Sequence, residues 1–149
     1  MTPEQVLTSA DSILVIDWPS RDVPETLARA GYTVLVKGGP EPDNFSAWQL
    51  RDAEVVVAKL GRGPSHVDIV YAHRPVAELP GIAAMARRFA ATTVWCQSGR
   101  SPSGASDPTG VWLPDEEASQ ARAIVEQAGL RYVNAPYIAD LARELRIDG

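Results

Sequence analysis

The stretch SILVIDWPSRDVPETLARAGYTVLVK (residues 12–37) decides the fold. Its two ends, residues 12–17 and 32–37, are near-continuous aliphatic runs, which are typical of parallel strands covered on both faces. The segment between them starts with an acidic turn at Asp22 and closes at Gly31, and these start and stop signals predict a helix. The stretch is therefore interpreted as one strand–helix–strand unit.

The same alternation continues towards the C-terminus. Aliphatic runs are followed by segments whose apolar residues recur at helical spacing. Strands are predicted at residues 67–72, 92–97 and 130–135, and helices within residues 73–89, 114–129 and 136–145. This order predicts an α/β fold: a single doubly wound, mostly parallel, Rossmann-like sheet with helices on both faces. We expect adjacent parallel strands at residues 12–17, 32–37, 67–72 and 92–97.

The stretch between the second and third of these strands, residues 43–65, is less regular. Residues 54–59 have the composition of a short strand, but the Gly and Pro that follow indicate a loop. Trp48 and Trp112 are accordingly expected in loops, whereas Trp95 is expected in the core. The polar residues 98–110 are predicted to be the most flexible stretch of the chain.

Length and composition favour one soluble domain, residues 1–149. The hydrophobic content is 45% and the charged content is 22%, which are ordinary values for a globular protein. A net charge of −5 argues against binding to nucleic acid or to an anionic membrane surface. The single cysteine, Cys96, excludes an intramolecular disulfide, and the N-terminus lacks the pattern of a secretory signal. A cytoplasmic location is therefore expected.

Recognisable catalytic machinery is missing from the sequence. It contains no nucleophile-elbow serine motif, no Walker loop and no GxGxxG fingerprint. The acidic residues 115–117 open a predicted helix, where they interact favourably with its dipole. His73 has no nearby His or Cys that would complete a metal site, and Cys96 is interpreted as a small buried hydrophobe. We expect neither a metal site nor catalysis.

Several blocks of the sequence resemble the stand-alone CoA-binding domain proteins, which are relatives of the CoA-binding domain of succinyl-CoA synthetase. The resemblance covers about residues 12–134, and its most specific blocks are the middle and late ones. The matching blocks, in chain order, are SRD, AGYTVLVKGGP, VDIVYAHRPVAELP, VWCQSG and EEASQARAIVEQAGLRYV. The resemblance implies that CoA lies at the carboxyl ends of the strands, where open α/β sheets generally bind ligands.

The resemblance also implies a set of site residues. Arg74 stands at the family's Arg-Pro position and can offer a planar fork to a phosphate. Gln97, Ser98 and Gly99 pass from a strand end into a loop, where backbone N–H groups are expected to face a ligand. The full set of expected cofactor-binding residues is Trp18, Ser20, Arg21, Lys37, Gly38, His73, Arg74, Gln97, Ser98 and Gly99.

Two turns depart from the family pattern. The first-turn glycine, which lets the backbone approach a pyrophosphate, is replaced by Trp18, and Asp17 precedes it. The second-turn Asn-Pro is replaced by residues 37–40, KGGP. An aromatic side chain at Trp18 either packs as core or lid, or stacks on an adenine.

The resulting hypothesis is a small cytoplasmic protein that binds a nucleotide cofactor, CoA or acyl-CoA, without catalysis of its own. An NAD(P)-binding protein is one alternative. Lys37 stands where the second strand ends, and the acid that would bind the ribose of NAD is absent. This argues against NAD as the ligand and leaves NADP as an alternative. A ligand-free CoA-binding fold that serves as a protein-interaction module is the other alternative.

Overall fold

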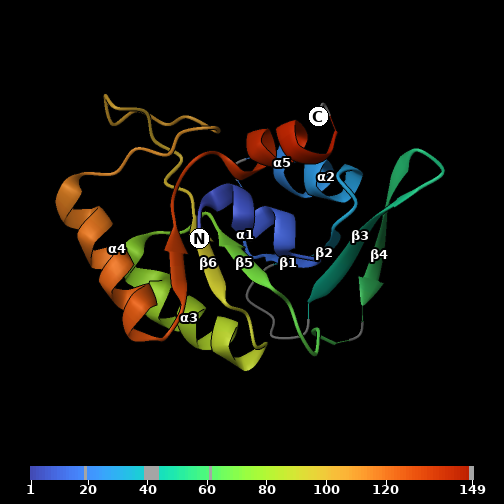
Figure 1. The fold of residues 1–149 in the computed structure, drawn as a ribbon, viewed down its shortest axis with the longest axis horizontal. Helices are drawn as coiled ribbons and strands as arrows, with labels where there is room; N and C mark the ends of the chain where they lie inside the picture. Colours follow the sequence, from blue (N-terminus) through green and yellow to red (C-terminus); the bar gives the residue numbers. More distant parts are fainter. Residues whose placement is uncertain (19, 39–43, 61, 148–149) are drawn as a thin grey trace.

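The computed structural model describes residues 1–18, 20–38, 44–60 and 62–147, and its centre is a seven-stranded sheet (Figure 1). The strand order is β4-β3-β2-β1-β5-β6-β7. The strands are β1 (Ser12–Val15), β2 (Thr33–Lys37), β3 (Phe45–Arg51), β4 (Glu54–Leu60), β5 (Ile69–Ala72), β6 (Thr93–Cys96) and β7 (Arg131–Val133).

Strands β2, β1, β5, β6 and β7 are parallel. Ile13 of β1 lies opposite Val34 of β2 on one side and Ile69 of β5 on the other, and all three side chains are buried. The four strands that were expected to be adjacent and parallel are so, which confirms that prediction. Their continuous burial follows from cover on both faces of the sheet.

Helices cover both faces of the sheet, as the alternating pattern predicted (Figure 1). One core cluster joins the sheet to α1 (Pro3–Ser9), α2 (Asp22–Arg29) and α5 (Ile138–Arg146). A second cluster joins the opposite face to α3 (Leu79–Arg88) and α4 (Asp115–Gln127). A short 3-10 helix, η1 (Val76–Glu78), leads into α3. The fold is therefore a doubly wound, Rossmann-like α/β fold, and Trp95 lies in its core as predicted, 1% exposed.

The interpretation of residues 43–65 was incomplete. Residues 45–51 form a strand that the sequence analysis did not predict, and it pairs antiparallel with both β2 and β4. Asp52 and Ala53 make the connecting turn with φ of 52° and 68°, a left-handed pair that matches the twist of a two-residue hairpin. Trp48, which was expected in a loop, is a buried β3 residue with 6% exposure. Trp112 does lie outside the helices and strands.

The polar loop between β6 and α4 is internally hydrogen-bonded. The Gly99 N–H donates to the Gly110 carbonyl at 3.0 Å, and the Asp107 N–H donates to the Gly99 carbonyl at 2.8 Å. A Cβ on Gly110 would lie 2.3 Å from the Arg100 carbonyl oxygen, so the two sides of the loop approach closely. The stretch that was predicted to be the most flexible thus has a defined internal structure.

The chain reverses direction across the sheet between β1 and β5. From β1 it proceeds to β2 on one side, and after the hairpin it returns to β5 on the other. Such a switch point leaves a crevice at the carboxyl ends of the two strands. No helix within the described ranges is long and apolar enough to cross a bilayer.

Candidate functional site

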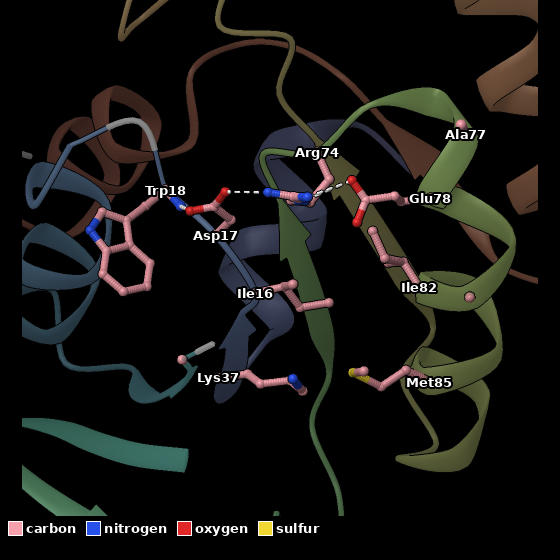
Figure 2. Close-up of a pocket in the computed structure, with 11 residues that line it drawn as sticks. Ile16, Asp17, Trp18, Lys37, Arg74, Ala77, Glu78, Ile82 and Met85 are labelled. Atoms are coloured by element: carbon pink, nitrogen blue, oxygen red, sulfur yellow. Dashed lines mark hydrogen bonds and ion pairs between the residues drawn. The ribbon is translucent and has the colours of Figure 1, made fainter. Parts of the chain in front are cut away.

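A cleft with a volume of about 880 Å³ lies at this switch point (Figure 2). The carboxyl ends of β1 and β2 form one wall, and the η1–α3 segment forms the other. We name it the first cleft. Its lining residues are Ile16, Asp17, Trp18, Lys37, Gly38, Arg74, Ala77, Glu78, Gly81, Ile82 and Met85.

Arg74 is held in this cleft by two carboxylates (Figure 2). Its Nη1 donates to Asp17 Oδ2 at 3.1 Å, and its Nη2 and Nε donate to Glu78 Oε2 at 2.6 and 3.0 Å. The hydrogen bonds to Glu78 and then to Asp17 raise the pKa of Arg74. A phosphate that binds this guanidinium must therefore displace Asp17 and Glu78 or share the guanidinium with them.

The first turn uses its own polar groups. Asp17 Oδ1 accepts a hydrogen bond from the Trp18 N–H at 2.8 Å, which occupies a donor that a glycine turn would offer to a ligand. The Trp18 indole packs edge-on against Trp48, with ring centroids 6.4 Å apart. Pro19, the next residue of the turn, lies outside the described residues. Asp17 and Trp18 thus make their contacts within the protein.

Two predicted site residues of this turn support α2 instead of lining a cleft. Ser20 Oγ accepts from the Asp22 N–H at 3.3 Å. Arg21 pairs with Glu25 at 3.1 Å, and its guanidinium lies 4.5 Å from the centre of the Trp48 ring. Among the described residues, neither Ser20 nor Arg21 lines the first cleft or the second one described below.

The first turn of α2 is also occupied by protein groups. Asp22 accepts hydrogen bonds from Arg143 Nη2 at 2.7 Å and from Tyr137 Oη at 3.0 Å. Burial raises the pKa of Asp22, but the hydrogen bonds from Arg143, Thr26 and Tyr137 outweigh it and leave this pKa below its usual value. A carboxylate thus stands at this helix start, where a phosphate-binding fold offers bare N–H groups.

The turn after β2 contributes Lys37 and Gly38 to the first cleft. The Gly38 N–H donates to the Asn44 carbonyl at 2.8 Å, next to the paired residues Lys37 of β2 and Phe45 of β3. Residues 37–40 stand where the family has Asn-Pro. Of these four, Gly39 and Pro40 lie outside the described residues.

A second cleft of about 470 Å³ lies beside the first. It is bordered by the end of β6, the loop after it, the η1–α3 segment and Ala121 of α4. Arg74 lines both clefts, so they meet at this side chain. We name it the second cleft; it is lined by His73, Arg74, Pro75, Val76, Leu79, Cys96, Gln97, Ser98, Gly99, Arg100, Gly104, Ser106, Leu113 and Ala121.

His73 and Gly99 lie in close contact in the second cleft. Gly99 has a φ of +66°, and a Cβ at this position would lie 2.1 Å from His73 Cε1. Only glycine allows both this backbone conformation and this approach of the imidazole. His73 Nδ1 is buried and has no hydrogen-bond partner within the described part of the chain.

Gln97 and Gly99 use their backbone N–H groups within the protein, which contradicts the expectation that these groups face a ligand. The Gln97 N–H donates to the Ala72 carbonyl, and the Gly99 N–H donates to the Gly110 carbonyl. The Gln97 side chain is 3% exposed; its Oε1 accepts from Tyr71 Oη, and its Nε2 donates to the Pro108 carbonyl at 2.7 Å. Gln97 therefore positions the loop.

The remaining polar side chains of the second cleft are either paired with an opposite charge or uncharged. Arg100 pairs with Glu117 of α4. Ser98 Oγ donates to the Gly110 carbonyl at 3.3 Å. Cys96 is 8% exposed, and burial raises the pKa of its thiol to about 12, so the thiol is protonated at neutral pH. This burial agrees with its interpretation as a small hydrophobe.

Sequence reasoning missed several residues that line the two clefts. Glu78, at the end of η1, and Ile82 and Met85 of α3 border the first cleft. Ile82 and Met85 recur at helical spacing, and that pattern alone assigns them to a core. Leu113 and Ala121 border the second cleft from a loop and from α4, and no local motif marks either of them. Groups of three or more His, Cys, Asp or Glu residues that suit a metal ion are not found among the described residues.

Comparisons with known proteins bear on the family and on the fold. A family model described as a CoA binding domain matches residues 16–140. No curated protein matches the sequence. The solved structure "cell-free ID.343 from Thermus thermophilus" is 24% identical, with a TM-score of 0.57 over 97% of this chain and 99% of that one. The structure of Prb, a PH1109 protein redesigned for binding, is 18% identical, with a TM-score of 0.58 over 95% of this chain and 88% of that one. At these identities the two structures establish a similar fold only.

Proposed function

Because the chain belongs to the CoA-binding domain family, we propose that it binds CoA or acyl-CoA at the carboxyl ends of its parallel strands, without catalysis of its own. The observation that carries the proposal is the first cleft, which lies at the switch point and contains both Lys37 and Arg74. Its volume of about 880 Å³ lies in the range of small-molecule sites, roughly 300–1,000 Å³.

The phosphate groups of CoA are assigned to this cleft because Lys37 and Arg74 both line it. Arg74 provides a planar guanidinium, which suits bidentate contact with a phosphate. Asp17 and Glu78 already bind this guanidinium, so CoA has to compete with them. The glycine cradle is also replaced by Trp18. Binding is therefore weaker than in a family member that has a glycine turn and an unpaired arginine.

The absence of catalysis is part of the proposal and is supported by the groups near the two clefts. The Cys96 thiol is buried and protonated, so it lacks the reactivity of a thiolate. The carboxylates of Asp17 and Glu78 are bound to Arg74, and that of Glu117 to Arg100. The proposed role is to bind and present a cofactor.

Isothermal titration calorimetry with CoA, and separately with NADPH, tests the proposal. CoA should bind the wild type, and Arg74→Ala should weaken binding by about 1.5 to 3 kcal/mol, the usual contribution of a hydrogen bond to a charged group. Arg122→Ala is a matched control, because Arg122 also forms an (i, i+4) pair with a glutamate, Glu126, but lies outside both clefts. Binding of NADPH without CoA, or equal affinities of the two variants for CoA, would contradict the proposal.

A further inference from the structure

Strand β4 forms one edge of the sheet. Among the described strands it pairs with β3 alone, and it lies at the margin of the molecule (Figure 1). Most of its residues are exposed, and the side chains of Val56 and Val57 are 44% and 45% exposed. The strands in the centre of the sheet are by contrast buried. Strand β4 thus combines exposed apolar side chains with an open strand edge.

The hydrogen bonds of the hairpin show which backbone groups of β4 face this open edge. The Gly38 N–H donates to the Asn44 carbonyl, in the same register as the β2–β3 pair. Because backbone groups alternate in direction along a strand, the even-numbered residues of β3 face β2 and the odd-numbered ones face β4. The partners of these odd-numbered residues are the even-numbered residues of β4. The N–H and C=O groups of Val55, Val57 and Lys59 therefore point away from β3.

The centre of β4 lacks the features that usually protect an open edge. Proteins place charges or proline on such strands, or interrupt them with a β-bulge. The sequence of β4, EVVVAKL, contains no proline, and its two charges, Glu54 and Lys59, stand near its ends. Its register with β3 is continuous, so no bulge interrupts it. The apolar centre of β4 is therefore available to another strand.

The charges around β4 favour an antiparallel partner with the same sequence. Asp52 and Glu54 lie at the hairpin turn, whereas Lys59 and Arg62 lie towards the other end of β4. These four residues are exposed, and none of them forms an ion pair with another described residue. Arg51, also near the turn, lies on β3, one strand further from the edge. Two antiparallel copies of β4 would place the acidic end of each beside the basic end of the other, whereas parallel copies would bring like charges together.

The outward-facing backbone groups also select one register. Two residues that exchange hydrogen bonds in an antiparallel ladder must both face the shared edge. Val57 is the central residue of β4 and faces the open edge, so two copies can pair over the whole strand about a two-fold axis beside Val57. Val57 then lies opposite Val57 of the second copy, and Val55 lies opposite Lys59 of the second copy. Since Val57 is also the partner of Trp48 in β3, an apolar row would cross the junction.

We infer that β4 is a homodimerisation edge, which pairs antiparallel with β4 of a second copy of this chain about a two-fold axis at Val57. One sheet then continues through both subunits, and the same surface is used by each of them. The inference is independent of the proposed function, because none of residues 54–60 lines either cleft. Loss of the dimer should therefore leave the affinity for CoA unchanged.

Sedimentation velocity from micromolar to millimolar protein concentration tests the inference. The wild type should form dimers as the concentration rises. Val57→Lys and Val57→Glu should each raise the dimer dissociation constant by about tenfold or more, because like charges would lie directly opposite each other. An equimolar mixture of the two variants should form a heterodimer that is more stable than either homodimer. Leu50→Lys is the matched control: Leu50 is 42% exposed on the same hairpin but belongs to β3, so this variant should dimerise like the wild type.

Each alternative result has a definite meaning. A wild type that remains monomeric at millimolar concentration would overturn the inference. It would also be overturned if Val57→Lys dimerised as well as the wild type, or if Leu50→Lys lost the dimer to the same extent. A mixture of Val57→Lys and Val57→Glu without heterodimers would overturn the register at Val57.

Amide hydrogen exchange of the wild type, followed by NMR, tests the same contact without a substitution, and it decides the question if a charged variant does not fold. The N–H groups of Val55, Val57 and Lys59 should exchange more slowly at high than at low protein concentration. The N–H groups of Val56 and Ala58 face β3 and should change less. Exchange at Val57 that does not depend on protein concentration would overturn the inference.

Discussion

Replacing Asp17 with Asn should increase the affinity for CoA, because it removes one of two carboxylates that compete with the ligand for Arg74. Asp17 Oδ2 lies 3.1 Å from Arg74 Nη1, and Glu78 Oε2 lies 2.6 Å from Nη2. Glu78→Gln should act in the same direction, and the double variant should exceed either single one.

The exposure of these side chains sets the magnitude. Asp17 is 38% exposed, Glu78 is 45% exposed and Arg74 is 40% exposed, so the pairs are screened by solvent. Pairs of this kind typically contribute about 0.2 to 1 kcal/mol, which corresponds to an affinity gain of about 1.4- to 5-fold for each substitution. A carboxylate about 4 Å from a phosphate would add repulsion of up to roughly 4 kcal/mol at an effective dielectric of 20, but this exposure keeps the expected gain close to the lower range.

Calorimetry at low and high salt is the suitable assay. The gain for Asp17→Asn should shrink as salt is added, because the Debye length falls from about 10 Å at 0.1 M to about 3 Å at 1 M ionic strength. Glu126→Gln is the matched control: it changes the net charge equally and breaks an (i, i+4) pair with Arg122 outside both clefts. Unchanged or weaker CoA binding by Asp17→Asn and Glu78→Gln at low salt would refute the competition.

Four further predictions concern stability and the first turn. Gly99→Ala should lower the free energy of unfolding, measured with urea, by more than the roughly 1 to 2 kcal/mol of left-handed strain, whereas Gly104→Ala, at φ +85° with open space around it, should cost only that strain. Trp18→Gly should lose the aromatic pair with Trp48, worth about 0.5 to 1.5 kcal/mol of stability, and should bind CoA more tightly by calorimetry because the backbone is cleared; weaker binding would instead indicate adenine stacking. The pKa of Asp22 is lowered in the folded state, so the stabilisation that its carboxylate contributes is present above about pH 3.8 and is lost as the pH falls through the folded-state pKa. Asp22→Asn should therefore be less stable than the wild type at pH 7, and the unfolding free energy of the variant should fall less between pH 5 and pH 3 than that of the wild type. A chain of one domain should unfold in a single cooperative transition, with coincident fluorescence and circular dichroism curves.

The parallel part of the sheet was predictable because its signals are local. Each of its central strands is a run of mostly apolar residues, and Gly31 and Gly129 end two helices with φ of +93° and +82°, as expected of helix-terminating glycines. The β3–β4 hairpin gave a weaker signal: residues 54–59 have the composition of the strand that forms there, but the turn at Asp52 and Ala53 is left-handed without an Asn-Gly or Asp-Gly pair. The seven-residue α1 was also missed: Thr2 and Gln5 form a capping box and Pro3 stands in its first turn, but the helix is too short for a clear apolar period.

The candidate site was predictable in position but not in electrostatics. The carboxyl ends of the strands follow from the fold, and Arg74, Lys37 and Gly38 do line a cleft there. The pairing of Arg74 with Asp17 joins residues 57 positions apart and depends on the orientation of both side chains. The use of the Gly99 N–H by Gly110 is likewise set by the path of a loop, which no local pattern specifies.

The unpredicted β3 strand packs against the unusual first turn. Trp48 of β3 contacts both the Trp18 ring, at 6.4 Å between centroids, and the Arg21 guanidinium, at 4.5 Å. A glycine in place of Trp18 would leave the buried Trp48 without this aromatic neighbour, so the residue that removes the phosphate cradle also anchors the hairpin to the start of α2. The loss of the glycine and the presence of the hairpin are therefore physically coupled, and the cations of the first cleft, Lys37 and Arg74, are the groups left to bind a phosphate in the proposed complex.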